Sequence, residues 1–198
     1  MRYFLIIGVL ILVGGLAIIW LGAKDQPYNN LPGENSATQE TKMIILSPAF
    51  KEGDRIPAKF TCEGGDINPE LHIQGVPDNA KSLALIMDDP DAPAGTWLHW
   101  TVWNINLKTA VIKEESVPPG SVEGITSSKD IGYGGPCPPA SPKLQRGEPP
   151  GNPHRYYFRL YALDVMLDLK TGASRSELEQ AMAGHIVAQA ELMGTYGR

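Results

Sequence analysis

Proline and glycine are concentrated in one part of this chain, residues 106–153. The segment holds more than half of the 17 prolines and a third of the 21 glycines. Proline fixes φ and has no backbone N–H to donate, so this segment cannot supply central strands or a long helix. We expect it to form surface loops, and the ordered scaffold must then come from the segments on either side. Long loops beside a rigid scaffold often hold binding sites.

The segments around these loops have the pattern of β-strands. They are short apolar runs or alternating apolar and polar residues, and turn residues bound them. The strands that we expect cover residues 43–47, 81–87, 98–105 and 154–164. The pattern predicts a mainly β fold, in which the last two segments lie at or near the centre of an antiparallel sheet.

Alternation along residues 98–105 also predicts which side chains share a face. Successive side chains of a regular strand point in opposite directions. We therefore expect Leu98 and Trp100 on one face of the sheet and His99 on the other.

The C-terminal region has a different pattern. In residues 174–192, Ser174 precedes Glu177 by three positions, which is a capping box, and apolar residues up to Ile186 follow at helical spacing. We expect one helix here, the only long helix of the folded domain.

The chain begins with an apolar segment. Residues 3–22 carry no charge, and about 20 apolar residues of helix cover the hydrocarbon core of a bilayer. We expect a transmembrane anchor in residues 1–23; the alternative is a cleaved signal peptide, although its apolar region is usually only ~7–15 residues long. Arg2 before the segment places the folded domain outside the cytoplasm by the positive-inside rule. Cleavage would instead leave a secreted or periplasmic protein.

Residues 24–42 are polar, contain proline and glycine, and lack apolar periodicity. This composition is typical of a solvated, flexible tether. We therefore expect the folded domain to cover residues 43–198.

The charge of the chain argues against one class of partner. It has 17 basic and 22 acidic residues, a net charge of −5, and no long run of one sign. A nucleic-acid-binding protein needs a basic surface, so we expect no nucleic-acid partner.

The two cysteines, Cys62 and Cys137, leave two interpretations open. An oxidising compartment outside the cytoplasm would preserve a disulfide between them. Two buried free thiols are the alternative, because a sequence does not show whether two Cα atoms come close enough to be bridged. Neither cysteine has a second cysteine or a histidine at the spacing of a zinc site.

The segment "DDPDAP", residues 88–93, crowds three carboxylates at the end of a predicted strand. The prolines make it a stiff loop. Three neighbouring acids repel one another unless a histidine, a cation or backbone N–H groups take up the charge. The chain offers His99 on the next strand and His154 at the start of another.

Asp89, Asp91, His99 and His154 could form one site with any of three uses. They could bind a divalent metal, an Asp could orient a His general base, or the imidazoles could form an anion pocket with backbone N–H groups of "GYGG", residues 132–135. A fourth possibility is that these residues have structural roles only. An Asp before Pro is a common turn former, and a strand His is often a hydrogen-bonded structural residue.

Five motifs in order resemble the phosphatidylethanolamine-binding protein family, in its bacterial and archaeal Raf-kinase-inhibitor-like branch. They are "FTCEGGDINPEL" (60–71), "DPDAP" (89–93) followed by "HW" and "WNI" (99–105), "GGPCPP" (134–139), "HRYYFRLYALD" (154–164) and "GHIVAQAELMGTY" (184–196). The resemblance spans about residues 43–198. It implies a large central antiparallel sheet, a smaller second sheet packed on it as in a β-sandwich, and a short C-terminal helix.

The resemblance also implies a small pocket for phosphate-like anions, no catalysis and no cofactor or metal. Carried over by motif, the residues at this pocket are Asp89, Asp91, His99, Gly134, Gly135, Pro136, His154 and Tyr156. Asp91 is expected to support the loop, and Gly134 to Pro136 to form a wall. Eukaryotic relatives often add a Tyr before the strand His, where "AGTWL" of this chain has Trp97.

Three functions are compatible with these observations. The first is a membrane-tethered binding module for a phosphate-bearing small molecule or a phospholipid headgroup. The second is an inhibitor or regulator of a partner kinase or peptidase, with no partner identified by the sequence. The third is a metal-dependent hydrolase built from the same acids and histidines.

Overall fold

The computed structural model describes residues 42–140 and 153–198. The predicted anchor and the tether up to residue 41 lie outside these ranges. Within the two ranges, no helix combines the length and the apolar character needed to cross a membrane.

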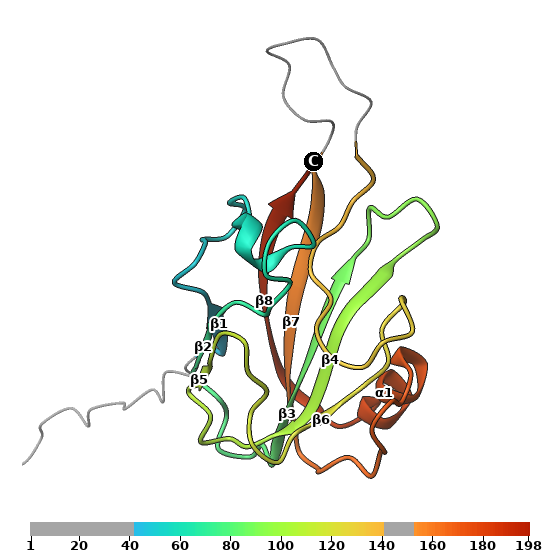
Figure 1. Ribbon diagram of the computed structural model, residues 1–198. Helices are drawn as coiled ribbons and strands as arrows, with labels where there is room; N and C mark the ends of the chain where they lie inside the picture. Colours follow the sequence, from blue (N-terminus) through green and yellow to red (C-terminus); the bar gives the residue numbers. More distant parts are fainter. Residues whose placement is uncertain (1–41, 141–152) are drawn as a thin grey trace, which may run out of the picture. The chain divides into compact units, whose positions relative to one another are not determined.

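The larger of two antiparallel sheets has the strand order β6-β4-β3-β7-β8. Figure 1 shows these strands side by side, with β3 between β4 and β7. Its strands are β3 (Ser82–Asp89), β4 (Trp97–Ile105), β6 (Val122–Glu123), β7 (His154–Leu163) and β8 (Ile186–Tyr196). The two segments predicted to be central are β4 and β7, which flank the middle strand.

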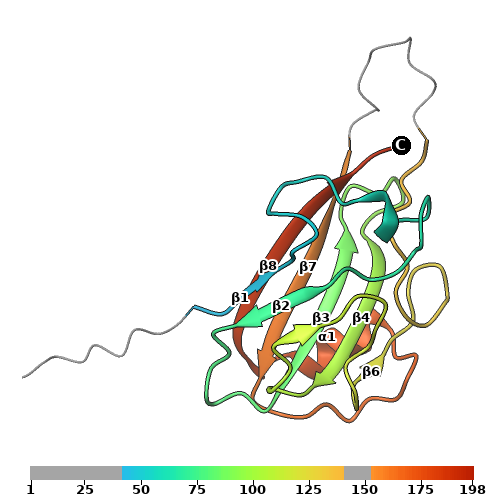
Figure 2. The same cartoon turned by 60° about the vertical axis from the view of Figure 1, so that its left-hand side comes forward.

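A smaller sheet, in the order β1-β2-β5, covers one face of the large sheet (Figures 1 and 2). Its strands are β1 (Ile44–Leu46), β2 (Leu71–Gln74) and β5 (Val111–Ile112), and a short 3-10 helix, η1 (Ala58–Phe60), precedes β2. The main core lies between the two sheets and includes Trp100, Tyr156 and Phe158. The predicted mainly β fold with two antiparallel sheets is confirmed.

The short C-terminal helix that the resemblance implies is present, although the helical spacing of apolar residues predicted a longer one. Helix α1 (Arg175–Met182) begins with the capping box, in which Ser174 and Glu177 each accept from the other's backbone N–H. It packs on the opposite face of the large sheet, where Leu178 and Met182 join a second apolar cluster. The expectation that the helix extends to residue 192 is wrong. Gly184, with a φ of +80°, follows the last helical turn, and strand β8 then pairs along the length of β7, so sheet pairing overrides helical spacing.

The predicted faces of β4 are also wrong in part. Met87 pairs with Trp100 but Asp88 pairs with Leu98, so one extra residue of β4, His99, is inserted as a β-bulge. Trp100 belongs to the core between the sheets, whereas Leu98 belongs to the cluster beneath α1. The bulge turns His99 toward Tyr156, on the face that Trp100 occupies.

The close packing between β8 and the loop before η1 yields a stability prediction. A Cβ at Gly194 would lie 2.6 Å from Ile56 Cγ1 and 2.8 Å from Phe50 Cε2. Gly194→Ala should therefore lower the free energy of unfolding by about 1–3 kcal/mol, measured by urea denaturation. Gly134→Ala is the matched control, because its Cβ would meet nothing closer than His99 O at 3.8 Å. Equal stability of the two variants would contradict the packing described here.

Candidate functional site

The strand order brings the predicted site residues to one edge of the large sheet. Because β3 runs antiparallel to both neighbours, its C-terminal end lies beside the starts of β4 and β7. Asp89 ends β3, His99 is near the start of β4, and His154 opens β7. Pairing across the sheet therefore gathers residues that are distant in the sequence.

Asp89 is a buried carboxylate that orders its surroundings. Its Oδ2 accepts a hydrogen bond of 2.8 Å from His154 Nδ1, and its Oδ1 accepts one of 2.8 Å from the backbone N–H of Asp91. The Asp89 side chain is 4% exposed and that of His154 is 16% exposed. Asp89 thus fixes the orientation of the His154 ring and leaves its Nε2 for other partners.

His99 is held in the same way by a backbone carbonyl. Its Nδ1 lies 2.7 Å from the carbonyl oxygen of Gly134, and the N–H of Gly134 donates to the carbonyl oxygen of His99 at 2.9 Å. A carbonyl oxygen only accepts, so Nδ1 carries the hydrogen and Nε2 is left free. Burial lowers the pKa of His99 below the ordinary 6.5, although the bond to Gly134 and the charge of Asp89 oppose this.

Tyr156 lies in contact with both histidines. Its ring meets the edge of the His99 ring at 5.2 Å between centroids and stacks on the His154 ring at 6.5 Å. Burial, followed by the charge of Asp89, raises the pKa of Tyr156 well above 10.0. Its hydroxyl is buried and has no hydrogen-bond partner among the described residues. The phenol of Tyr156 therefore stays neutral beside the two imidazoles.

A cavity of about 470 Å³ opens above these groups. Of the predicted site residues, Asp89, His99, Gly134, Gly135 and His154 line it. Apolar residues form much of the remaining lining, including Ala92, Pro93, Ala94, Trp97, Leu98, Pro138 and Pro139. The cavity thus combines two imidazoles with an apolar surround, the usual composition of a small-ligand site.

The other predicted residues, Asp91, Pro136 and Tyr156, lie around this cavity rather than in its lining. Asp91 binds the Arg155 guanidinium at 2.7 and 2.8 Å and accepts from its backbone N–H at 2.9 Å. The bonds from Arg155 lower the pKa of Asp91 to about 2. Pro136 is buried behind the wall, and its carbonyl accepts from the N–H of Cys62 at 3.3 Å. Asp91 and Pro136 therefore hold the surrounding loops.

The cavity has lining residues that the sequence alone did not indicate. They are Asp66, Trp97, Ser128 and the two cysteines. Asp66 Oδ1 accepts from the N–H of Gly135 at 2.7 Å, and Cys62 is joined to Cys137 by a disulfide. Asp66 and Cys62 come from a loop that precedes the site by more than twenty residues, so only the fold brings them there. Trp97 lies two positions before His99, and the sequence offered no reason to assign it to the pocket lining.

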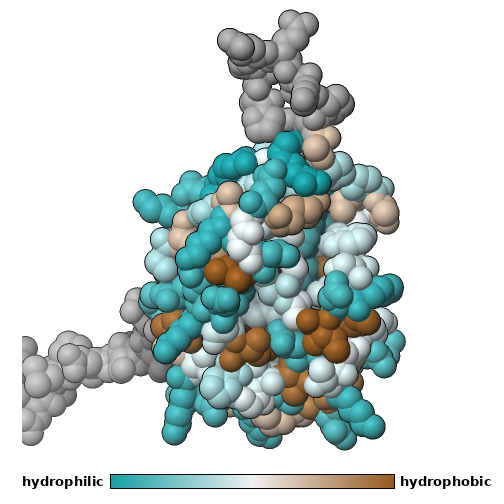
Figure 3. Space-filling model, viewed as in Figure 1, coloured by the Kyte–Doolittle hydropathy of each residue, from teal (hydrophilic) through white to brown (hydrophobic). Residues whose placement is uncertain are grey.

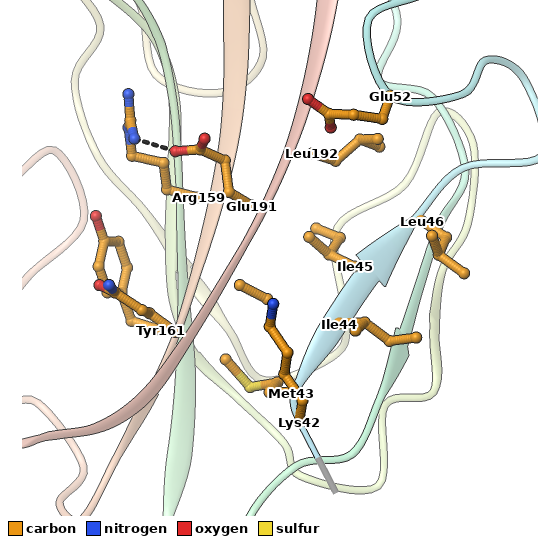
Figure 4. Close-up of a pocket in the computed structure, with 12 residues that line it drawn as sticks. Lys42, Met43, Ile44, Ile45, Leu46, Glu52, Arg159, Tyr161, Glu191 and Leu192 are labelled. Carbon is orange, nitrogen blue, oxygen red and sulfur yellow. Dashed lines mark hydrogen bonds and ion pairs between the residues drawn. The ribbon is translucent and has the colours of Figure 1, made fainter.

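A second cavity, of about 600 Å³, lies between β1 and β8 (Figure 4). Its lining includes Ile44 and Ile45 on one side and the ion pair of Arg159 with Glu191 on the other. None of the predicted site residues lines it. The smaller cavity is therefore the candidate site, because its polar groups converge on one place.

The other histidines of the described residues do not line the candidate cavity. Apolar side chains on the face in Figure 3 form separate patches among hydrophilic ones. His72 pairs with Glu70, and His185 pairs with Asp164, each at 2.7 to 2.8 Å and away from the cavity. In residues 42–140 and 153–198, no three His, Cys, Asp or Glu side chains converge as metal ligands do.

Comparison with known proteins places the chain in a family. Residues 46–197 match the family model described as phosphatidylethanolamine-binding protein. The chain belongs to this family. The resemblance seen in the motifs is thereby confirmed.

Relatives of the chain occur in archaea and bacteria. A UPF0098 protein of Methanothermobacter thermautotrophicus is 45% identical over 161 residues, which cover 79% of this chain and 99% of the relative. A UPF0098 protein of Pyrococcus horikoshii is 46% identical over 166 residues, covering 81% and 79%.

Two solved structures share the fold. A phosphatidylethanolamine-binding protein homologue of Chlamydia trachomatis has a TM-score of 0.71 and 41% identity, and the match covers 80% of this chain and 99% of that one. Escherichia coli YbcL, described as a new member of the mammalian family, has a TM-score of 0.70 and 29% identity, with 79% and 99% covered.

The burial of His99 gives a prediction for its titration. In the folded protein the midpoint for His99 should fall below 6.5, because the cationic ring loses more hydration than its partners restore. The unfolded chain then takes up this proton at a higher pH than the folded protein does. The free energy of unfolding therefore decreases as the pH falls from 6.5 through the lower pKa of His99 in the folded protein. Two-dimensional NMR of the imidazole signals measures the midpoint, and the urea-unfolded chain is the control. An equal or higher midpoint in the folded protein would contradict the assignment.

Proposed function

We propose that this protein is a binding module, without catalytic activity, whose small cavity takes a phosphate-like anion. The guest would be a small phosphorylated molecule or the phosphate of a lipid headgroup, since both present the same oxygens. One observation carries the proposal. His99 and His154 each donate Nδ1–H to a protein oxygen, and both rings line the same cavity.

The hydrogen bonds of the two rings set the chemistry of the site. Because each Nδ1–H is already used, a ring can donate to an anion only from Nε2, and this requires a second proton. Anion binding should therefore be coupled to proton uptake. The phenol ring of Tyr156 lies against both rings from outside the cavity and helps to fix their positions.

The proton coupling is tested with sulfate, which stays a dianion across the pH range used. Its affinity for the full-length chain should rise as the pH falls from 8 to 5.5, by up to ~tenfold per pH unit for each linked proton. Isothermal titration calorimetry measures the affinity, and repetition in buffers of different ionisation enthalpy counts the protons taken up. An affinity that is flat, or that rises with pH, would overturn the proposal.

Two variants assign the effect to the pocket. His99→Gln and His154→Gln should each weaken sulfate binding at low pH and flatten its pH dependence. His185→Gln is the matched control, because His185 also donates to a carboxylate, that of Asp164, but lies outside the cavity. An equal loss in the control would point to a general charge effect.

The source of the phosphate is a separate question with its own comparison. The affinity for glycerol phosphate is compared with the affinity for phosphatidylcholine vesicles that contain or lack phosphatidylethanolamine. Preference for the soluble ester supports a small-molecule ligand, and preference for the phosphatidylethanolamine vesicles supports a headgroup. Stoichiometric zinc or manganese in the purified protein would instead favour the metal-dependent hydrolase, which has no support from the described residues.

We further propose that residues 1–23 hold the domain at the outer side of a membrane and that residues 24–42 tether it. The support is the uncharged apolar segment of residues 3–22 and the polar composition that follows it. The full-length chain should remain with the membrane fraction after washes in high salt and at alkaline pH. Mass spectrometry of the intact chain is the control for processing. A soluble protein that has lost its first residues would replace the anchor with a cleaved signal peptide.

A further inference from the structure

The disulfide between Cys62 and Cys137 forms part of the wall of the anion pocket. Both cysteines line the cavity, their Cα atoms are 5.5 Å apart, and 75 positions separate them in the sequence. Both residues are exposed, unlike the buried groups on the pocket floor. Exposed disulfides are accessible to thiols and are more often labile than buried ones.

The bridge joins the two segments that position the pocket groups. The segment 134–137 provides the carbonyl of Gly134 that holds His99. The segment 60–66 provides the carboxylate of Asp66 that holds the N–H of Gly135. Movement of either segment would therefore disturb the wall and the partner of His99.

The segments 134–137 and 60–66 are in close van der Waals contact at Gly135. A Cβ there would lie 2.3 Å from Phe60 O and 2.7 Å from Asp66 Oδ1. Three hydrogen bonds cross the same contact, from Tyr133 Oη to Phe60 O, from Gly135 N to Asp66 and from Cys62 N to Pro136 O. The disulfide is the only covalent link across it. Without the bridge, these partly buried bonds and the packing of Phe60 and Tyr133 would hold the segments, and water competes for the bonds.

We propose that the Cys62–Cys137 bridge is a redox latch on the pocket, an inference that rests on the proposed anion-binding function. With the bridge closed, Gly134 holds His99 and the pocket binds its anion. With the bridge reduced, the segment 134–137 is free to separate from 60–66, and affinity for the anion falls.

The reductant is a dithiol, either a small molecule or a protein with two cysteines. Its thiolate attacks one sulfur of the bridge, the Cys62–Cys137 bond breaks, and a mixed disulfide forms. The second thiol of the reductant then closes on the first, and both cysteines leave as thiols. Two electrons and two protons pass from the dithiol to the bridge, and the dithiol becomes a disulfide.

The latch predicts that binding and reduction are linked. Sulfate affinity of the full-length chain, measured at pH 6 by calorimetry, should fall about fivefold or more on reduction with dithiothreitol and return on reoxidation. Linkage requires the reciprocal effect, so saturating sulfate should make the bridge harder to reduce by the same factor. Titration with mixtures of dithiothreitol and its oxidised form measures this second quantity.

The variant Cys62→Ser/Cys137→Ser should bind sulfate as weakly as the reduced protein and should not respond to dithiothreitol. Circular dichroism of the reduced wild-type protein reports whether it remains folded, so the test does not depend on folding of the variant. Global unfolding on reduction would overturn the latch and leave the bridge as a structural crosslink.

The outcomes separate the two proposals. Equal sulfate affinity in the oxidised and reduced proteins would overturn the latch and leave the anion pocket standing. No sulfate binding by the oxidised protein at any pH would overturn the proposed function, and the latch with it.

Discussion

The carboxylates at the end of β3 impose the constraint on which the pocket depends. Three acids in four positions repel one another unless each has its own cationic or hydrogen-bonding partner. The fold separates them because successive residues of a strand point to opposite faces. The pairs are Asp88 with Arg159 and Arg175, Asp89 with His154, and Asp91 with Arg155. One acidic segment thus attaches helix α1 to one face of the sheet and orders an imidazole on the other.

The pocket has a floor and walls of different origin. The floor comes from adjacent strands of the large sheet, where backbone pairing fixes Asp89 opposite Trp97 and Tyr156 opposite Gly194, and the bulge on β4 presents His99. The walls come from loops rich in proline and glycine, which are joined to each other by side-chain bonds and by one disulfide. Loops on a rigid scaffold are a common place for binding residues.

Membership of the phosphatidylethanolamine-binding protein family accounts for the fold. What a given member binds depends on the groups lining its own cavity, because one fold supports many functions. In this chain the lining combines Trp97 and several prolines with two imidazoles that each have one free nitrogen. The lining therefore places two imidazoles beside apolar side chains.

The sequence by itself determined strands β1, β3, β4 and β7 and the start of the helix, and it singled out the acids after β3 and two histidines as candidates for one site. Alternation, turn residues and the capping box are local signals, and each is written in a few neighbouring positions. Three features were decided only by the tertiary structure: the bulge at His99, the conversion of residues 186–192 from predicted helix to strand β8, and the arrival of Asp66 and Cys62 at the pocket. Each depends on pairing or packing with a distant segment. Local periodicity carries no information about such a partner, so these features appear only when the chain is folded.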